Sequence, residues 1–261
     1  MMGRIIGYQM RDVIRGRSVP LFAVVLAALV FLMTELGGEG PRILVSLLNV
    51  NLLLVPLVSI LFGTLYIYHA WEFIELLLTQ PLGRKRLFVG LYIGLVLPLC
   101  AAVAIGLGAP FAPAVVRGAL PASLLAVFLG TCLLLTAIFV ALGFLIALRY
   151  DNRLRGLGIA LAMWFLFTVV YDGVALFGAF AFRAYPLEKP LIALMMLNPV
   201  DLSRVAVLLQ TDTSALMGYT GAAFSRALGG VRGLSVSGGV LFLWLCVPFF
   251  FAMRRFSRRD F

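Results

Sequence analysis

The sequence has little charge and few of the side chains that catalyse reactions in soluble enzymes. Only 12% of its 261 residues are charged, and it contains one histidine and three cysteines. One histidine excludes an HExxH zinc site, and the sequence has no Ser-His-Asp set, Walker A loop or GxGxxG motif. We therefore expect no catalytic residue, metal or cofactor in this chain, and an enzyme is the least favoured class.

The three cysteines do not suggest a metal or disulfide site. Cys100, Cys132 and Cys246 are far apart in apolar segments, without a CxxC motif or a disulfide framework. A thiol cluster for a soft metal is the less favoured alternative, because buried helix cysteines usually serve as small packing residues.

Apolar residues are abundant, at 63% of the chain, which leaves too little polar surface for a soluble globule. A hydrocarbon layer ~30 Å thick requires about 20 helical residues, whereas barrel strands would alternate. Continuously apolar segments near or above that length occupy 20–36, 43–68, 87–108, 121–148, 157–182 and 237–253. We predict a single-domain, all-α integral membrane protein with six transmembrane helices over residues 1–261.

Cations indicate the orientation of these spans. The short loops on one side hold only Arg42 and Arg117. The other side holds Arg4, Arg11, Arg15, Arg17, Arg84, Lys85, Arg86, Arg149, Arg153, Arg155, Arg254, Arg255, Arg258 and Arg259. The positive-inside rule predicts cytoplasmic N- and C-termini. The positive-inside bias of the loops and the attraction of cations to anionic membrane lipid account for the net charge of +10, so no nucleic acid partner is needed to explain it.

Amphipathic patterns predict helices outside the spans. Residues 1–19 have the pattern of a helix lying in the membrane interface. In the loop after the second span, 71–79 is helical in character, Pro81 removes a backbone donor and Gly83 allows a tight turn. A short helix held at the cytoplasmic membrane surface could dock into a recess on a partner protein. The cations of this loop are explained equally well by the positive-inside rule alone.

Three stretches add a family resemblance. "ELLLTQPLGRKRLFVG" (75–90) resembles the LL-x-P-x-x-R signature that follows the second span of ABC-2 type exporter permeases. "MWFLFTVVYDGVAL" (163–176) and "LNPVDLSR" (197–204) resemble the branch that serves maturation of the copper enzyme nitrous oxide reductase. The sequence departs from the family in lacking a Gly-Thr pair in the helix before the signature.

This resemblance implies a homodimeric permease in the bacterial inner membrane, working with two copies of a cytoplasmic ATPase that bind ATP and Mg²⁺. A coupling helix within 70–86 would sit on the ATPase. The residues assigned to this contact are Glu72, Glu75, Thr79, Pro81, Leu82, Gly83 and Arg84. A periplasmic subunit is the third partner implied.

Polar residues within the spans are rare enough to mark function. Asp172, beside Tyr171, lies a little past the middle of the fifth predicted span. A carboxylate at that depth costs about 2.5–3.5 kcal/mol unless it is paired or faces water. It could face a translocation path or dimer seam together with Asn49 and Asn51. Alternatively, it bonds a neighbouring helix, with Tyr171 or Asn51 as partner.

The segment 183–236 is too long for a simple connection. Asn198-Pro199 starts a predicted external amphipathic helix over 199–210, with Asp201 in its first turn. Asn198, Pro199, Asp201 and Arg204 are expected to meet the periplasmic partner, the alternative being a lid on the lipid surface.

Two classes of function follow. The first is an exporter permease, either of the copper-enzyme maturation branch or a general exporter of lipid or drug-like cargo. The second is a membrane protein that transports nothing, either a scaffold for a periplasmic partner or an unrelated channel.

Overall fold

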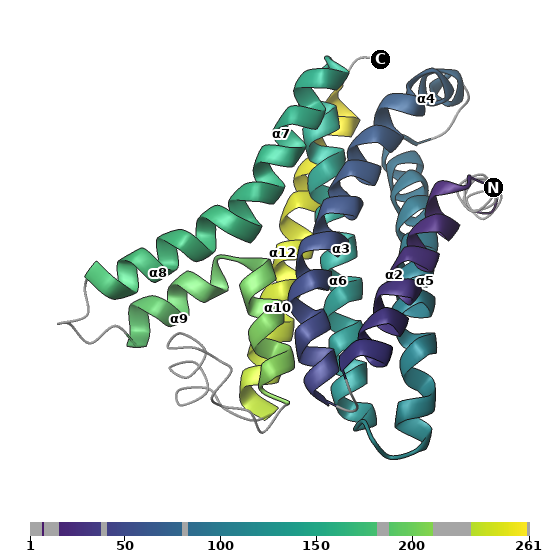
Figure 1. Cartoon of the computed structure of the whole chain (residues 1–261). Coiled ribbons are helices and arrows are strands. Elements are labelled where there is room, and N and C mark those ends of the chain that lie inside the picture. Colours follow the sequence, from purple (N-terminus) through teal and green to yellow (C-terminus); the bar gives the residue numbers. More distant parts are fainter. Residues whose placement is uncertain are drawn as a thin grey trace.

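The structure, a computed structural model of the whole chain, describes residues 7, 16–37, 41–79, 83–181, 188–210 and 231–259. In these ranges all regular secondary structure is helical, and six helices are long and apolar enough to cross a membrane (Figure 1). The predicted all-α fold with six spans is confirmed. The interfacial helix predicted over 1–19 falls almost wholly outside the described residues.

The spans are built from long helices that follow one another along the chain. They are α2 (Ser18–Gly37), α3 (Pro41–His69), α5 (Arg84–Val116), α6 (Ala122–Arg149), α7 (Arg153–Phe165) with α8 (Tyr171–Ala181), and α12 (Val231–Arg258). A π-helical turn, η1 (Leu166–Val170), joins α7 to α8. The shorter helices are α4 (Trp71–Leu78), α9 (Glu188–Met196) and α10 (Pro199–Leu208).

Several helices extend beyond their predicted apolar segments. α5 continues past residue 108 through Pro110 and Pro113, because membrane helices tolerate proline where neighbouring groups satisfy the backbone. α12 continues into its terminal arginines because the hydrogen bonds of a helix do not depend on apolar side chains. Hydropathy therefore locates the membrane-embedded part of each helix and not its ends.

Helix α6 is the centre of the bundle and packs against α3, α5 and α12. In its apolar stretch 78% of the residues are buried, against 17% in the span made by α7 and α8. Glycines let α3 and α6 approach closely: a Cβ on Gly143 would lie 2.6 Å from the carbonyl oxygen of Ile60. Likewise, a Cβ on Gly63 would lie 2.8 Å from that of Val140. Small residues serve this purpose in membrane helices.

The start of α2, helix α4 and the end of α12 lie at one end of the molecule, and the α5–α6 connection lies at the other (Figure 1). We name the first the basic end, after the arginines at 84–86, 149–155 and 254–259. Helix α7 begins at the basic end and diverges from the bundle with α8, which follows it, so that α8 and α9 form a projecting arm (Figure 1).

Candidate functional site

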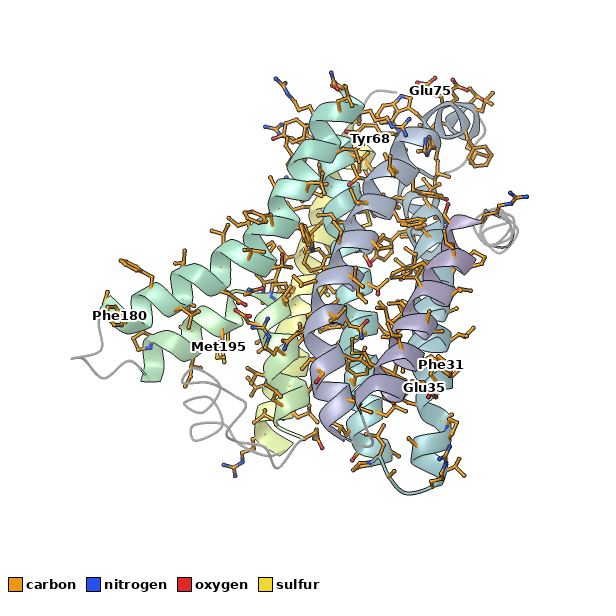
Figure 2. The ribbon with its side chains drawn as sticks, in the orientation of Figure 1. Phe31, Glu35, Tyr68, Glu75, Phe180 and Met195 are labelled. Atoms are coloured by element: carbon orange, nitrogen blue, oxygen red, sulfur yellow. The ribbon has the colours of Figure 1, made fainter. Side chains whose placement is uncertain are left out.

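Helix α4 lies at the basic end, where it connects α3 to α5 (Figure 1). Ile74 is fully buried and fixes the inner side of the helix. On the outer side Glu72 and Glu75 are exposed (Glu75 is labelled in Figure 2), and the side chain of Leu76 is 67% exposed. Thr79 Oγ1 donates to the carbonyl oxygen of Leu76 at 2.8 Å, next to the C-terminus of the helix. α4 therefore presents carboxylates and an apolar side chain from a fixed base.

Contacts on either side of α4 connect it to the end of α12. Arg84 donates to the carbonyl oxygens of Ser257 (3.3 Å) and Arg259 (2.9 Å). The guanidinium of Arg259 lies 4.3 Å from the ring centroid of Trp71, a cation–π contact, and it pairs with Asp151. A displacement of α4 would therefore be transmitted to α12 and to the α6–α7 connection.

Two of the residues predicted for the coupling element, Pro81 and Leu82, lie outside the described residues. Gly83 is described and precedes α5 in an extended conformation. The ATPase-coupling role of this set stays a prediction.

A second group of polar side chains lies where α8 meets α10. We name Asp172, Asn198, Asp201 and Arg204 the polar cluster. Arg204 Nη1 lies 3.1 Å from Asp172 Oδ2 and 3.2 Å from Asp201 Oδ1. Asn198 Nδ2 donates to Asp201 Oδ2 at 3.1 Å. Because a carboxylate in apolar surroundings is costly without a partner, Arg204 accounts for the depth of Asp172.

The polar cluster also supports the π-helical turn η1. The backbone N–H of Tyr171 bonds the carbonyl of Leu166, which is the five-residue spacing of a π-helix. Asn198 Nδ2 donates at 2.8 Å to the carbonyl oxygen of Phe167, which lies in the turn. Thr168 Oγ1 donates to the carbonyl four residues before it, a bond that often bends helices. The turn is thus held from outside its own helix.

Burial raises the pKa of Asp201 to about 7. The neighbouring carboxylate of Asp172 contributes to this rise in pKa, while Arg204 and Asn198 oppose it. A pKa in this range predicts that Asp201 exchanges a proton near neutral pH.

The structure joins Asp172 to α10 but not to the polar residues of α3. The expectation that Tyr171 or Asn51 would be the partner of Asp172 is wrong, because the partner is Arg204. The Tyr171 hydroxyl donates to a carbonyl of α9, and the buried side chain of Asn51 makes no hydrogen bond within the described residues. Asn49 is exposed. A translocation path or dimer seam through these residues stays a prediction.

Helix α10 forms close to where it is predicted, with Asn198 capping its start, but almost all of it is buried. It packs against α6 and α12 as well as α9, so its polar side is also covered. Asn198, Pro199 and Asp201 are buried, whereas the side chain of Arg204 is 32% exposed. Of the residues predicted to meet a periplasmic partner, Arg204 is the accessible one in this arrangement.

Comparison with known proteins identifies the family. The model of the ABC-2 family transporter proteins matches residues 51–261, which is most of the chain and includes α4 and the polar cluster. The chain belongs to the ABC-2 transporter family. It is similar to the probable ABC transporter permease protein NosY of Pseudomonas aeruginosa, with 33% identity over 186 residues, 68% of this chain and 67% of that protein. It is also similar to the protein of the same name from Stutzerimonas stutzeri, with 30% identity over 255 residues, 92% of this chain and 90% of that protein.

For this ABC-2 permease, sequence reasoning missed the residues that join the elements. The only sequence signal for the pairing of Arg204 with Asp172 was charge complementarity between an acid within a span and an arginine of a helix later in the chain. The contacts of Arg259 with Trp71 and Asp151 had no local signal, because they join segments far apart in the sequence.

Proposed function

We propose that this permease couples ATP hydrolysis by a separate cytoplasmic ATPase to export or conformational work, with α4 as the coupling helix. The observation that carries the proposal is the exposed face of α4, with Glu72, Glu75 and Leu76 pointing away from a buried anchor at Ile74. A short helix that offers charges and one apolar side chain from a fixed base suits a socket on a partner protein. ATP and Mg²⁺ would be bound by the ATPase and not by this chain.

The packing of the bundle indicates how force on α4 would travel. α4 is continuous with α3 through one residue, and α3 packs tightly on α6 through its glycine contacts. Arg84 and Arg259 connect the same region to α12. Movement of α4 would therefore tilt several spans together, which is a rigid-body transition.

The working unit would contain two permease copies, with the weakly buried α7–η1–α8 span as the surface that meets the second copy. Phe165, Val169 and Phe177 are exposed along this span, and the α8–α9 arm projects from the bundle (Figure 1). A second copy would cover this apolar surface and support the arm.

We further propose that the transporter serves copper-site maturation of nitrous oxide reductase in the bacterial inner membrane. The support is the similarity to two NosY permeases and the likeness of 163–176 and 197–204 to that branch. The partners would then be a NosF-like ATPase and a periplasmic NosD-like protein. A general exporter of lipid or drug-like cargo, or a scaffold that transports nothing, is the alternative.

The test is a pull-down of the detergent-solubilised permease with the ATPase encoded beside it. Glu75→Arg should abolish or strongly weaken capture, because it reverses a charge on the exposed face of α4. Glu35→Arg makes the same charge change on an exposed residue of α2 and should leave capture unchanged. Equal capture by all three proteins would contradict the coupling role of α4, and no capture by the wild type would contradict the ATPase partnership.

A further inference from the structure

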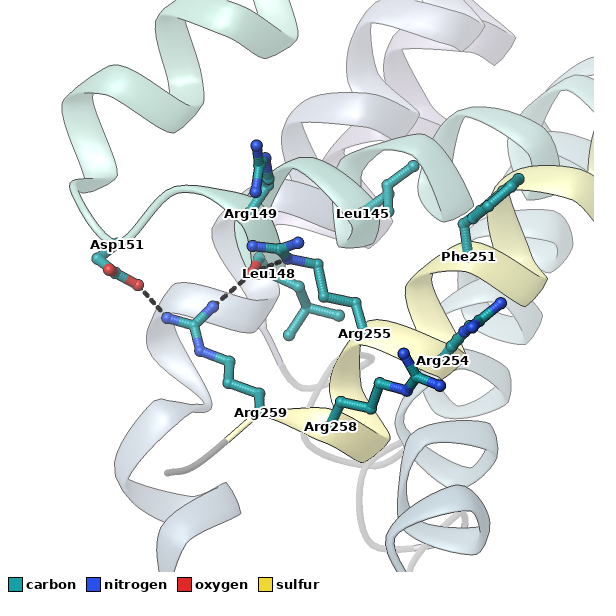
Figure 3. Close-up of a pocket in the computed structure, with 9 residues that line it drawn as sticks. All are labelled: Leu145, Leu148, Arg149, Asp151, Phe251, Arg254, Arg255, Arg258 and Arg259. Carbon is teal, nitrogen blue, oxygen red and sulfur yellow. Dashed lines mark hydrogen bonds and ion pairs between the residues drawn. The ribbon is translucent and has the colours of Figure 1, made fainter.

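A basic pocket lies between the ends of α6 and α12 at the basic end (Figure 3). Its volume is about 550 Å³. Its charged lining consists of Arg149, Arg254, Arg255, Arg258, Arg259 and Asp151. Five guanidinium groups against one carboxylate make this pocket strongly attractive to an anion.

Internal contacts use only part of this charge. Arg255 Nε donates to the carbonyl oxygen of Leu148 at 2.9 Å, and Arg259 donates to the same oxygen at 2.6 Å while pairing with Asp151 (Figure 3). These contacts fix one wall of the pocket. Among the described residues, the other arginines of the pocket make no hydrogen bond or ion pair with protein groups. Their donors are available to a ligand.

An apolar groove continues from the basic pocket along α12. It has a volume of about 360 Å³, and Phe251 and Arg254 line both cavities. Val247 and Phe250 also line the groove, about 10 Å of helix separating Val247 from Arg254. Phe256, on the inward face of α12, is buried and packs on the ring of Phe88. The groove therefore faces outward at the level of the membrane.

We infer that the basic pocket and its groove bind one anionic phospholipid, such as phosphatidylglycerol or cardiolipin. Its phosphate pairs with Arg254 and Arg258, since guanidinium groups bind phosphate oxygens with two parallel hydrogen bonds. One acyl chain lies along Val247 and Phe250. A zwitterionic headgroup fits less well because its ammonium group would meet the remaining arginines.

The apolar groove favours a lipid over the other anionic occupants. Free phosphate would use the guanidinium groups but leave the groove unfilled. An acidic surface of a soluble ATPase would meet the arginines but could not reach Val247, about two helical turns from Arg254 in the apolar part of α12. Basic pockets between membrane helices are common sites for anionic headgroups.

Thermal unfolding of the full-length permease in detergent tests this inference. Phosphatidylglycerol is titrated in, with phosphatidylcholine and inorganic phosphate as separate arms, and affinity is taken from the rise in Tm. Arg254→Gln with Arg258→Gln should weaken phosphatidylglycerol binding at least about tenfold. Val247→Trp fills the groove without changing charge and should also weaken it. Arg153→Gln with Arg155→Gln removes the same charge from exposed positions outside the pocket and should bind like the wild type.

Three outcomes would overturn the inference. An equal loss of phosphatidylglycerol affinity in the Arg254/Arg258 and Arg153/Arg155 double variants would indicate general attraction to a basic surface. If inorganic phosphate competes with phosphatidylglycerol and Val247→Trp leaves lipid affinity unchanged, the basic pocket is a simple anion site. Unchanged lipid binding with lost ATPase capture in the Arg254/Arg258 variant would assign the basic pocket to the ATPase interface.

Discussion

Arg204 is the residue on which the junction of α8 and α10 depends. It contacts carboxylates from both helices, and those carboxylates would otherwise face one another in surroundings of low polarity. Asn198 takes part in three ways, as helix cap, as donor to Asp201 and as donor to η1. Single side chains therefore decide how the fifth span is attached to α10.

The raised pKa of Asp201 predicts a pH dependence of stability. Its folded-state pKa of about 7 lies above the unfolded value of about 3.9. Its contribution is therefore fully present below about pH 4 and is lost as the pH rises towards about 7, by at most about 1.4 kcal/mol per pH unit. Asp201→Asn removes this titration, so its Tm should fall less than that of the wild type between pH 5 and pH 7.

The control for this measurement is Glu35→Gln, which neutralises an exposed carboxylate and should keep the wild-type profile. Parallel Tm–pH curves for the wild type and Asp201→Asn would contradict proton uptake by Asp201.

At the level of elements, glycines bring the backbones of α3 and α6 into close contact. A Cβ on Gly143 would meet backbone atoms of Ile60 and Thr64 at 2.6 and 2.9 Å. Backbone atoms cannot rotate aside as a flexible side chain can, so any substitution here must separate the two helices.

Gly143→Ala is therefore predicted to destabilise the permease by about 1–3 kcal/mol and to lower Tm by about 2–8 °C. Gly130→Ala is the matched control, because it lies on the same helix and its new Cβ would meet nothing within 4 Å. The control should retain the wild-type Tm or exceed it slightly, since alanine favours helix. Equal Tm values for the two variants in a thermal unfolding assay would refute the close approach.

The elements differ in how well the sequence predicts them. The spans and α4 follow from apolar length and helical spacing, both of which are local properties. The burial of α10 depends on neighbours that come from α6 and α12; its local hint is that residues 200–208 are apolar on most sides, which is typical of a buried helix. The turn η1 depends on Asn198 from another helix. Of the candidate sites, the exposed face of α4 was predictable and the Arg204–Asp172 pair was not.

The whole molecule is asymmetric in two respects. Its cations gather at the basic end, which matches a membrane protein whose cytoplasmic face meets anionic lipid and an ATPase. Its fifth span leaves the bundle and is the least buried of the six described spans, so α7 and α8 carry exposed apolar side chains away from the bundle. This surface is where the proposed second copy would pack.

Cross-linking tests where two copies meet. In a variant with Cys100, Cys132 and Cys246 replaced by alanine, Phe177→Cys should give a covalent dimer with a short bismaleimide in membranes. Ile105→Cys, on α5, is similarly exposed and should stay monomeric on a denaturing gel. Dimers from Ile105→Cys alone would place the interface elsewhere.

The π-helical turn also sets the phase of the fifth span. An α-helix advances about 100° per residue, so the extra residue in η1 rotates everything after it by roughly that angle relative to an unbroken helix. Asp172 lies just after the turn, so its contact with Arg204 is made with this offset in place. The two halves of the span therefore keep separate helical registers, and an apolar stripe traced along α7 does not continue onto the same side of α8.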